Sequence, residues 1–349
     1  MSKMFLEYIW VDGSEPTQTL RSKTKVVSSV LGSARYGLPN WGFDGSSTNQ
    51  ATGNKSDCIL QPVRIFADPT RANSYLVMCE VMNADGTPHP SNQRAKLRAI
   101  LSAGADNVDS WFGFEQEYVF MKGGKPLGWP AEGEPGPQGP YYCGVGSDKV
   151  AGREIVDKHM RLCADAGLMI EGTNFEVLLG QAEFQIGAGN PLLIADQLWL
   201  ARWLLQRLGE DYGVCVSWHP KPLLGDWNGS GCHANVSLAR TRIPSGTNSD
   251  STILGGLELI FEICEKFRLR SPEHIAAYGA DNSLRLTGKH ETCDINTFRF
   301  GVADRGASIR IPQHVANQGF GYFEDRRPAA NADPYQVCSV ILKTICDLW

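Results

Sequence analysis

Two glutamates separated by a single residue lie within an aromatic run, Trp111-Phe-Gly-Phe-Glu115-Gln-Glu117-Tyr118. If this run is a strand, the two-residue period of its side chains places both carboxylates on one face. Two like charges side by side among apolar side chains are costly unless a cation lies between them. A divalent metal ion with oxygen ligands is the cation that fits best. The pattern therefore predicts a strand that forms part of an acidic metal site.

Further glutamates continue this pattern downstream. Glu176 follows Asn174-Phe, and Glu183 is followed by Phe-Gln185, so polar and apolar residues alternate at both places. Each glutamate alone is compatible with a solvated surface position, but that interpretation is weaker for the set of four. Carboxylates that share several divalent ions are typical of phosphate chemistry. The four glutamates thus indicate a multi-metal acidic site.

Composition limits the classes of protein to be considered. A chain of 349 residues is long enough for one large or two ordinary domains. The net charge of −5 gives no electrostatic footprint for nucleic acid. No uncharged apolar stretch reaches the length of a membrane span, and the first residues show no signal-peptide pattern. The ten cysteines are scattered without a Cys-x-x-Cys pair, which predicts reduced thiols in a cytoplasmic protein.

The order of the predicted elements indicates the fold class. Strands are expected over 3–11, 25–30, 59–66 and 74–82, followed by a helix capped by Ser91 or Asn92 and a domain boundary near residue 105. Beyond the glycine- and proline-rich loop 123–146, helices are expected over 153–166, 194–208 and 251–267. Short strands are expected over 176–179, 182–186, 214–218 and 233–238. Because the elements do not alternate as βαβ units, the chain is predicted to be α+β with a largely antiparallel sheet.

A glycine-punctuated loop, residues 225–237, runs into one of these strands and contains His233. Glycine allows the backbone to approach a ligand closely. The histidine is a possible metal ligand beside hard carboxylates. A single histidine is more often a structural residue, so the glycine context is what favours the ligand interpretation.

Arginines gather in the last quarter of the chain, where Arg305 and Arg310 lie five residues apart in Asp304-Arg-Gly-Ala-Ser-Ile-Arg. The planar guanidinium group binds carboxylates and phosphates, although surface ion pairs are the competing explanation. An acidic metal site together with several arginines neutralises a polyanion from both sides, as a nucleoside triphosphate requires. The other arginines of this cluster are Arg285, Arg299, Arg326 and Arg327.

Taken together, these segments resemble glutamine synthetase, and specifically its type II branch. The resemblance runs nearly from end to end, and ordered agreement at so many motifs is not expected by chance. The motifs are Trp41-Gly-Phe-Asp44-Gly-Ser-Ser-Thr48, Phe112-Gly-Phe-Glu-Gln-Glu-Tyr118, Gly139-Pro-Tyr-Tyr-Cys-Gly-Val-Gly146, Asn228-Gly-Ser-Gly-Cys-His233, Leu286-Thr-Gly-Lys-His-Glu291, Arg305-Gly-Ala-Ser-Ile-Arg-Ile-Pro312 and Gly321-Tyr-Phe-Glu-Asp-Arg-Arg-Pro328.

The resemblance implies an architecture and a reaction. A small N-terminal β-grasp domain (residues 1–105) would precede a larger catalytic domain (residues 106–349) with a mainly antiparallel curved sheet and helices. Ten subunits would form two face-to-face pentameric rings with active sites between neighbours. The implied reaction is glutamate + ammonia + ATP → glutamine + ADP + phosphate through γ-glutamyl phosphate, with two or three Mg²⁺ or Mn²⁺ ions per site. Neither a nucleic acid nor a membrane is an expected partner.

The same resemblance implies the roles of charged side chains. One divalent ion would be held by Glu117, Glu176 and Glu183. The ion beside the ATP phosphates would be held by Glu115, His233 and Glu324. The transferred phosphate and the γ-carboxylate of glutamate would be neutralised by Arg305, Arg310 and Arg326.

Further positions are implied to contact the substrates. The amino-acid end of glutamate would meet Arg285, Asn228 and Gly229, together with Arg305 and Arg326. The nucleotide would meet Glu115, Asn235, Val236, Ser237, Arg305, Arg310, Tyr322 and Phe323. Asp44 resembles the residue that takes a proton from ammonium, which has no lone pair until it is deprotonated. Glu291 resembles a flap residue that shields the acyl phosphate from water.

Two residues depart from the pattern of the family. Trp usually precedes the glutamate at 183 and a small residue precedes the one at 176, whereas this chain has Ala182 and Phe175. Both lie beside predicted metal ligands and would alter the surroundings of the ions, or they are a compensating exchange of large and small side chains. The tyrosine-containing adenylylation loop of the type I branch has no evident match.

Three alternatives remain to be weighed against glutamine formation. A ligase for a larger amine would have lost Asp44 or changed its loop, and a non-catalytic member of the fold would have lost metal ligands, but both sets of residues are present. A guanidino kinase would share the arginine-rich phosphate site. The segments 228–233 and 286–291 argue against it.

Overall fold

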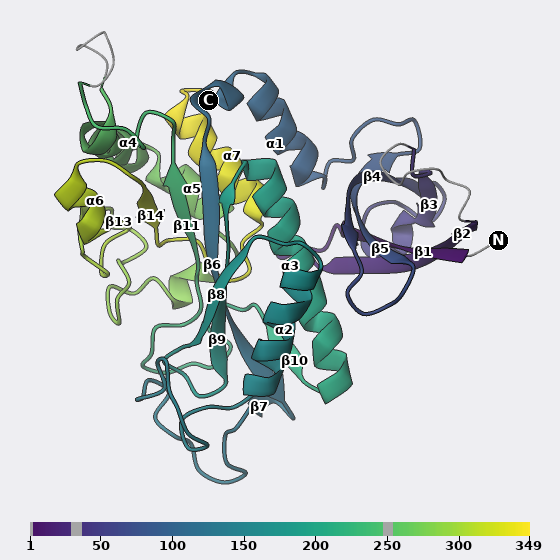
Figure 1. The fold of residues 1–349 in the computed structure, drawn as a ribbon, viewed down its shortest axis with the longest axis horizontal. Coiled ribbons are helices and arrows are strands. Elements are labelled where there is room, and N and C mark those ends of the chain that lie inside the picture. The colour runs from purple at the N-terminus through teal and green to yellow at the C-terminus, as the bar shows by residue number, and fades with distance from the viewer. Residues whose placement is uncertain (1–2, 29–36, 247–253) are drawn as a thin grey trace.

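The computed structural model describes residues 3–28, 37–246 and 254–349. It contains a five-stranded and a nine-stranded sheet, which Figure 1 shows as a small lobe beside a larger one. Helices and strands are both present, and most neighbouring strands run antiparallel, so the predicted α+β class is confirmed.

The small lobe is a mixed sheet in the order β2-β1-β5-β4-β3, in which β1 and β5 run parallel. Its apolar side chains include Leu6, Tyr8 and Leu60, which are shielded from solvent and form a separate core. The strand predicted over 25–30 begins earlier, at Leu20, and its last two residues lie outside the described residues. The strands are β1 (Lys3–Val11), β2 (Leu20–Ser28), β3 (Trp41–Asp44), β4 (Asp57–Ala67) and β5 (Ser74–Asn83).

The nine-stranded sheet has the order β12-β13-β14-β11-β6-β9-β8, with β7 and β10 paired to β6. The strand β6 lies at its centre and carries the aromatic run that contains Glu115 and Glu117. The strands are β6 (Trp111–Lys122), β7 (Lys125–Pro126), β8 (Ile170–Phe175), β9 (Gln181–Gly189), β10 (Cys215–Ser217), β11 (Cys232–Ser237), β12 (Phe300–Val302), β13 (Ile309–Ile311) and β14 (Phe323–Asp325).

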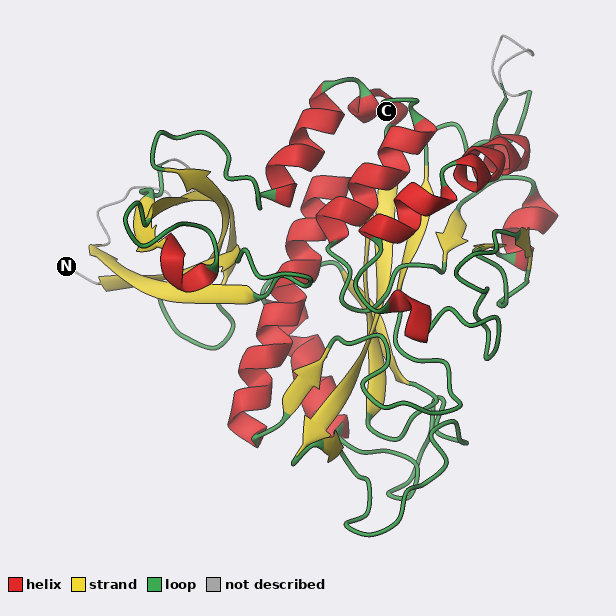
Figure 2. Cartoon of the chain, turned by 180° about the vertical axis from the view of Figure 1, so that it is seen from behind, coloured by secondary structure: helices red, strands yellow, loops and turns green. Residues whose placement is uncertain are grey.

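Helices pack on one face of this sheet, and long loops gather at one end of it (Figures 1 and 2). Asn92 caps the first helix, because its side chain accepts a hydrogen bond from the amide of Ala95, as predicted. None of the described helices is long and apolar enough to cross a membrane. The helices are α1 (Gln93–Ser102), α2 (Arg153–Asp165), α3 (Pro191–Tyr212), α4 (Gly256–Leu269), α5 (Ser271–Ala277), α6 (Gln313–Gln318) and α7 (Pro334–Ile345).

One predicted strand is wrong. Residues 176–179 follow β8 as a turn, and the strand lies instead at Ile170–Phe175. The turn closes at Gly180, whose φ of +93° is a conformation that glycine adopts at low cost. The apolar residues that suggested a strand have another function, since Leu178 packs against Val119 and Trp227 in a small separate cluster. The start of the helix predicted over 251–267 falls outside the described residues, and α4 begins at Gly256.

A buried ion network joins the small lobe to the helices of the large one. The Asp196 carboxylate on α3 is fully buried and accepts from Arg64 of β4 at 2.9 Å and from Arg94 of α1 at 2.7 Å. The Tyr335 hydroxyl on α7 donates to the same carboxylate at 2.6 Å. Because a buried carboxylate without partners is strongly destabilising, this network fixes α1 against the large lobe. The predicted boundary near residue 105 falls after α1 and stays a prediction.

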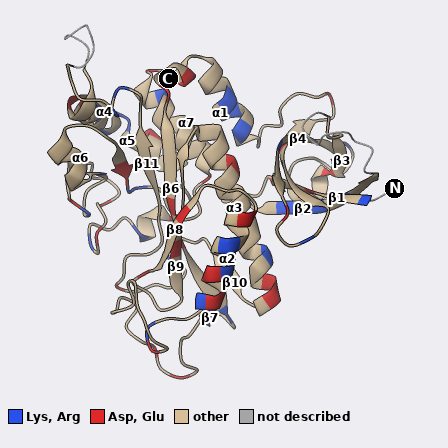
Figure 3. Ribbon diagram, in the orientation of Figure 1, with Lys and Arg blue, Asp and Glu red and all other residues tan. Residues whose placement is uncertain are grey.

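All ten cysteines are free thiols, as the sequence predicts. Figure 3 shows that acidic residues gather at the middle of the large sheet. The alternation along β6 explains this arrangement. Gln116 and Tyr118 are buried on the helix side, where Gln116 accepts from Arg202 of α3, and Glu115 and Glu117 therefore point to the opposite side.

Candidate active site

A cavity of about 450 Å³ lies on the face of the large sheet that carries Glu115 and Glu117. Both carboxylates line it, as the two-residue period of a strand predicts. Most of the charged residues singled out in the sequence meet here, although they come from distant parts of the chain. The lining includes Glu115, Glu117, Glu176, Glu183, Asn228, His233, Glu291, Arg305, Arg310 and Arg326, with Tyr142, Asn174, Val177 and Gln185.

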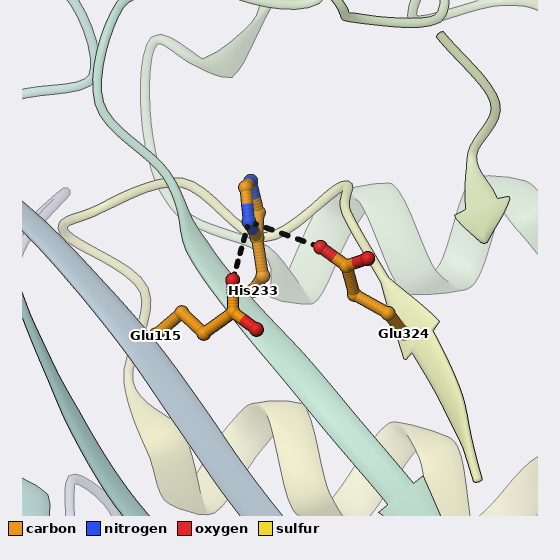
Figure 4. A group of neighbouring side chains, drawn as sticks. All are labelled: Glu115, His233 and Glu324. Atoms are coloured by element: carbon orange, nitrogen blue, oxygen red, sulfur yellow. Dashed lines mark hydrogen bonds and ion pairs between the residues drawn. The ribbon is translucent and has the colours of Figure 1, made fainter. Parts of the chain in front are cut away.

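Glu115, His233 and Glu324 point toward one another from β6, β11 and β14 (Figure 4). The Nδ1 atom of His233 lies 3.4 Å from a carboxylate oxygen of each glutamate. The strand register explains this, because His233 is paired with Glu115 and Glu324 is paired with Asn235 on the same strand. These three side chains bring together ligand atoms that suit a divalent ion with hard oxygen ligands and one imidazole.

His233 is buried, and this burial, reinforced by the charge of Arg326, holds its pKa well below the usual value. The imidazole is therefore neutral. Its Nε2 atom lies 2.9 Å from a guanidinium nitrogen of Arg285, which can only donate, so the ring proton is on Nδ1. Binding of an ion at Nδ1 would require that proton to leave.

Glu117, Glu176 and Glu183 form a second acidic group in the same cavity. Glu117 and Glu183 are cross-strand partners on β6 and β9, and Glu176 directly follows β8. Glu117 accepts from the Gly231 amide at 2.9 Å, and Glu183 accepts from Gln185 at 2.8 Å. Burial is the main cause of a raised pKa at all three, to about 7 for Glu117, to about 8 for Glu176 and well above the usual range for Glu183.

These raised pKa values predict a dependence of stability on pH. In the unfolded chain Glu176 titrates near 4.5, whereas in the folded protein its pKa is about 8, so the folded state holds its proton longer. The protein without divalent ions should therefore lose stability as the pH rises from about 5 to about 8. A divalent ion competes with these protons, so Mg²⁺ or Mn²⁺ should raise the melting temperature more at pH 8 than at pH 6. Thermal unfolding at both pH values measures this, and an equal shift at both would contradict it.

Three arginines face the acidic groups. Arg310 and Arg326 donate to the two carboxylate oxygens of Glu324 at 2.7 and 2.6 Å. Arg326 also donates to the backbone carbonyl of Arg305 at 2.9 Å, which fixes the loop that carries Arg305 at the edge of the cavity. The Arg305 side chain is solvent-exposed and lines the same cavity. The cavity is thus lined by both carboxylates and guanidinium groups.

Of the residues predicted to bind the amino-acid end of glutamate, some line the acidic cavity and others do not. Asn228 lines the cavity, and Gly229 beside it has a φ of +78° with the Pro220 carbonyl where a side chain would start. Arg285 lies behind His233 and does not line the cavity, because it is buried and donates to the Arg326 carbonyl at 3.1 Å. Burial lowers its pKa to about 10. Its substrate role stays a prediction.

A second cavity of about 500 Å³ adjoins the first, and Glu115 and Gln185 line both. The predicted nucleotide residues Asn235, Val236, Ser237 and Tyr322 also line it. Phe323 does not, because its ring is buried in the core against Phe267. Arg305 and Arg310 line the acidic cavity instead.

Two further residues of the second cavity were not found from the sequence. Trp111 begins β6, keeps 45% of its surface exposed, and carries the Arg242 guanidinium 4.2 Å above its ring. A tryptophan at the start of the strand that carries Glu115 and Glu117 is visible in the sequence, but its exposure is known only from the structure. No comparable signal marked Arg242, which also lies 3.2 Å from the Ser237 hydroxyl.

Asp44 lies in the small lobe, at the end of β3, and does not line the acidic cavity of its own chain. Its carboxylate is exposed and accepts from the hydroxyl groups of Ser46 at 2.6 Å and Ser47 at 2.7 Å. These hydrogen bonds lower its pKa, so the group is ionised at neutral pH. A carboxylate held in this way can attract a cation brought to the surface of the small lobe.

The two departures from the family pattern meet directly. Phe175 on β8 and Ala182 on β9 are cross-strand partners, so their side chains share one face. Both are buried. The register thus pairs a large side chain with a small one on the same face, which is the arrangement that a compensating exchange would have.

Comparisons with known proteins find the same family in both the N-terminal and the C-terminal part of the chain. A family model described as "Glutamine synthetase, beta-Grasp domain" matches residues 2–84, and one described as "Glutamine synthetase, catalytic domain" matches residues 92–255. A chloroplastic glutamine synthetase of Chlamydomonas reinhardtii is 52% identical over 98% of this chain and 90% of its own. Glutamine synthetases of Bradyrhizobium diazoefficiens and Candida glabrata are 51% and 49% identical over 99% of this chain and over 97% and 90% of their own lengths.

Proposed function

Because the chain belongs to the glutamine synthetase family, we propose that its acidic cavity joins ammonia to L-glutamate in an ATP-dependent reaction through γ-glutamyl phosphate. The products are glutamine, ADP and phosphate. The observation that carries the proposal is one cavity with carboxylates facing arginines, which shares Glu115 and Gln185 with a second cavity for the nucleotide.

The chain supplies the groups that each step needs. The γ-carboxylate of glutamate is a poor electrophile until an oxygen of it attacks the terminal phosphorus of ATP and ADP leaves. Arg305, Arg310 and Arg326 neutralise the charge that spreads over the transferred group. Ammonia then attacks the acyl carbon and phosphate leaves. Asp44 takes the proton of ammonium, and Glu291, whose φ of +60° is uncommon outside glycine, closes the cavity against water.

The donor sets suit two or three Mg²⁺ or Mn²⁺ ions. Glu115, His233 and Glu324 would hold one ion, and Glu117, Glu176 and Glu183 would hold another. The raised pKa values of the second group fit this assignment, since buried carboxylates of this kind need a cation to remain ionised. Bound there, the ions would supply positive charge that stabilises phosphoryl transfer.

The oligomer and the compartment belong to this proposal as well. Asp44 lies at the end of β3 in the small lobe and does not line the acidic cavity of its own chain, which favours a site completed by a neighbouring subunit in a decamer of two pentameric rings. The division into a β-grasp domain, residues 1–105, and a catalytic domain, residues 106–349, is proposed with it. The relatives include a chloroplastic protein, so the cytoplasmic location stays a prediction.

An assay of ADP release separates the proposal from its alternatives. With glutamate, ATP and Mg²⁺, rapid ADP release should require ammonium and should match the glutamine formed. A ligase for a larger amine would need that amine, and a guanidino kinase would release ADP with a guanidino substrate and no glutamate. Absence of turnover with every substrate would indicate a non-catalytic member.

Methionine sulfoximine is expected to inactivate the protein in an ATP-dependent manner. This tetrahedral analogue resembles the adduct formed when ammonia attacks the acyl phosphate, and such analogues bind far more tightly than substrates. Its phosphorylated form should be held by the arginines of the cavity and released slowly. Activity measured after preincubation and dilution, with and without ATP, tests this. Immediate recovery after dilution would count against a glutamine synthetase.

A further inference from the structure

The loop that carries Tyr142 is hydrogen-bonded to the residues on both sides of Glu176, namely Phe175 at the end of β8 and Val177 in the turn that follows. The Gly139 amide donates to the Val177 carbonyl at 3.1 Å, and the Cys143 amide donates to the Phe175 carbonyl at 2.9 Å. Cys143 has a φ of +51°, which costs a non-glycine residue of the order of 1 kcal/mol, so the attached loop needs a compensating contact. Tyr142 itself lines the acidic cavity.

Arg153, the first residue of α2, supplies such a contact. Its guanidinium group donates to the Gly144 carbonyl at 2.9 Å and lies 4.9 Å from the centre of the Phe175 ring. One side chain thus bridges the loop and the strand that ends beside Glu176. The bridge depends on a large residue at 175, because a small side chain there would not reach Arg153, and Ala182 is its cross-strand partner.

We propose that Arg153 and Phe175 are positioning residues that hold the loop 139–146 against β8 and so keep Tyr142 in the wall of the acidic cavity. Tyr142 is itself 59% exposed, so it forms the outer rim of the cavity. This inference rests on the proposed function, because an ordered rim limits the access of water to the acyl phosphate. If the loop opens, water attacks the acyl carbon in place of ammonia, phosphate leaves, and glutamate is regenerated. ATP is then consumed without glutamine being formed.

The main test compares Arg153→Ala with Arg161→Ala, which removes the same charge from an exposed position of the same helix. Hydrogen exchange of the Cys143 amide should be about tenfold faster or more in Arg153→Ala, because its hydrogen bond to Phe175 opens more often. The ratio of ADP to glutamine should rise roughly twofold or more, and Arg161→Ala should match the unchanged protein in both measurements. Arg153→Ala leaves the strand with the metal ligands unaltered.

Conservative and double variants separate positioning from a general loss of structure. Phe175→Tyr keeps the ring and should behave as the unchanged protein, whereas Arg153→Lys keeps the charge but loses the planar group and should fall in between. Phe175→Ala also removes a buried ring from the core, so the two variants are compared as a cycle. Arg153→Ala should speed exchange of the Cys143 amide less in the Phe175→Ala background than in the unchanged protein, because the guanidinium has already lost the ring. Additive effects would overturn the proposal.

Two other results would also overturn it. One is unchanged exchange at Cys143 in Arg153→Ala, and the other is faster exchange with an unchanged ratio of ADP to glutamine. If the unchanged protein makes no glutamine, the proposed function fails instead, and the exchange measurement still tests whether Arg153 and Phe175 hold the loop.

Discussion

Glu183→Gln is expected to abolish glutamine formation while the protein stays folded and assembled. Glu183 is 5% exposed and is paired with Glu117 in the β6–β9 register. The amide keeps an acceptor for the Gln185 side chain but removes a negative charge that a divalent ion needs. Because metal ions supply several kcal/mol of transition-state stabilisation, we expect kcat to fall about 100-fold or more.

A matched control is Glu265→Gln on α4, where an exposed glutamate pairs with Arg268 and a full rate is expected. Rates should be measured against Mg²⁺ and Mn²⁺ concentration, with light scattering to show the oligomer. Burial holds the pKa of Glu183 well above its usual range, so the neutral amide should not lower the melting temperature of the metal-free protein. Near-normal rates at low metal concentration would rule out Glu183 as a ligand.

The part of the site that lies on one strand could be predicted from the sequence. Alternation along β6 placed Glu115 and Glu117 on one face, because the side-chain period of a strand is independent of its partners. The same reasoning gave the bounds of β1 without error. Such local signals also gave the Asn92 cap, since a side chain within reach of the first helical amides needs no distant contact.

The arrangement between strands could not be predicted in this way. Glu115 and Glu324 are far apart in the chain and meet because β6 and β14 both pair with β11, a register that alternation alone does not specify. The pairing of Phe175 with Ala182 has the same origin. A large and a small side chain can compensate for each other only if the strands place them on the same face. The sequence alone therefore left open whether Phe175 and Ala182 are such an exchange or alter the surroundings of the ions.

For residues assigned a role by resemblance, the direction of the side chain matters as well as the position in the sequence. Tyr322 directly precedes β14, which begins at Phe323; Phe323 enters the core against Phe267, whereas Tyr322 lines the second cavity. Arg285 lies near the cavity, but its donors are taken up by His233 and by backbone carbonyls. A motif identifies such a residue without showing which way its side chain points.

Asp44→Ala and Arg305→Ala proteins should each be nearly inactive alone and should recover activity when mixed and reassembled. Arg305 lines the acidic cavity of its chain, whereas Asp44 lies in the small lobe and does not. If the small lobe of one subunit serves the cavity of the next, each active site pairs two different surfaces of neighbouring subunits. Random mixing in equal amounts would then leave roughly a quarter of these interfaces with both residues intact.

The design depends on separating assembly from catalysis. Both variants are denatured together, refolded, and compared with each variant refolded alone at the same total concentration. Light scattering confirms the oligomer, and different affinity tags on the two variants confirm that subunits have exchanged. Asp85→Ala, an exposed aspartate of the small lobe whose carboxylate also accepts from a nearby hydroxyl, provides a matched variant that should remain active alone.

The recovery of activity shows whether Asp44 serves the cavity of its own chain or that of a neighbouring subunit. If Asp44 served the cavity of its own chain, every site in a mixed oligomer would lack either Asp44 or Arg305, and mixing would restore nothing. Recovery toward a quarter of the unmutated rate requires sites built from two subunits. Absence of any gain, with exchange and oligomers both demonstrated, would defeat the shared-site model and leave the exposed Asp44 carboxylate without a role in ammonium deprotonation.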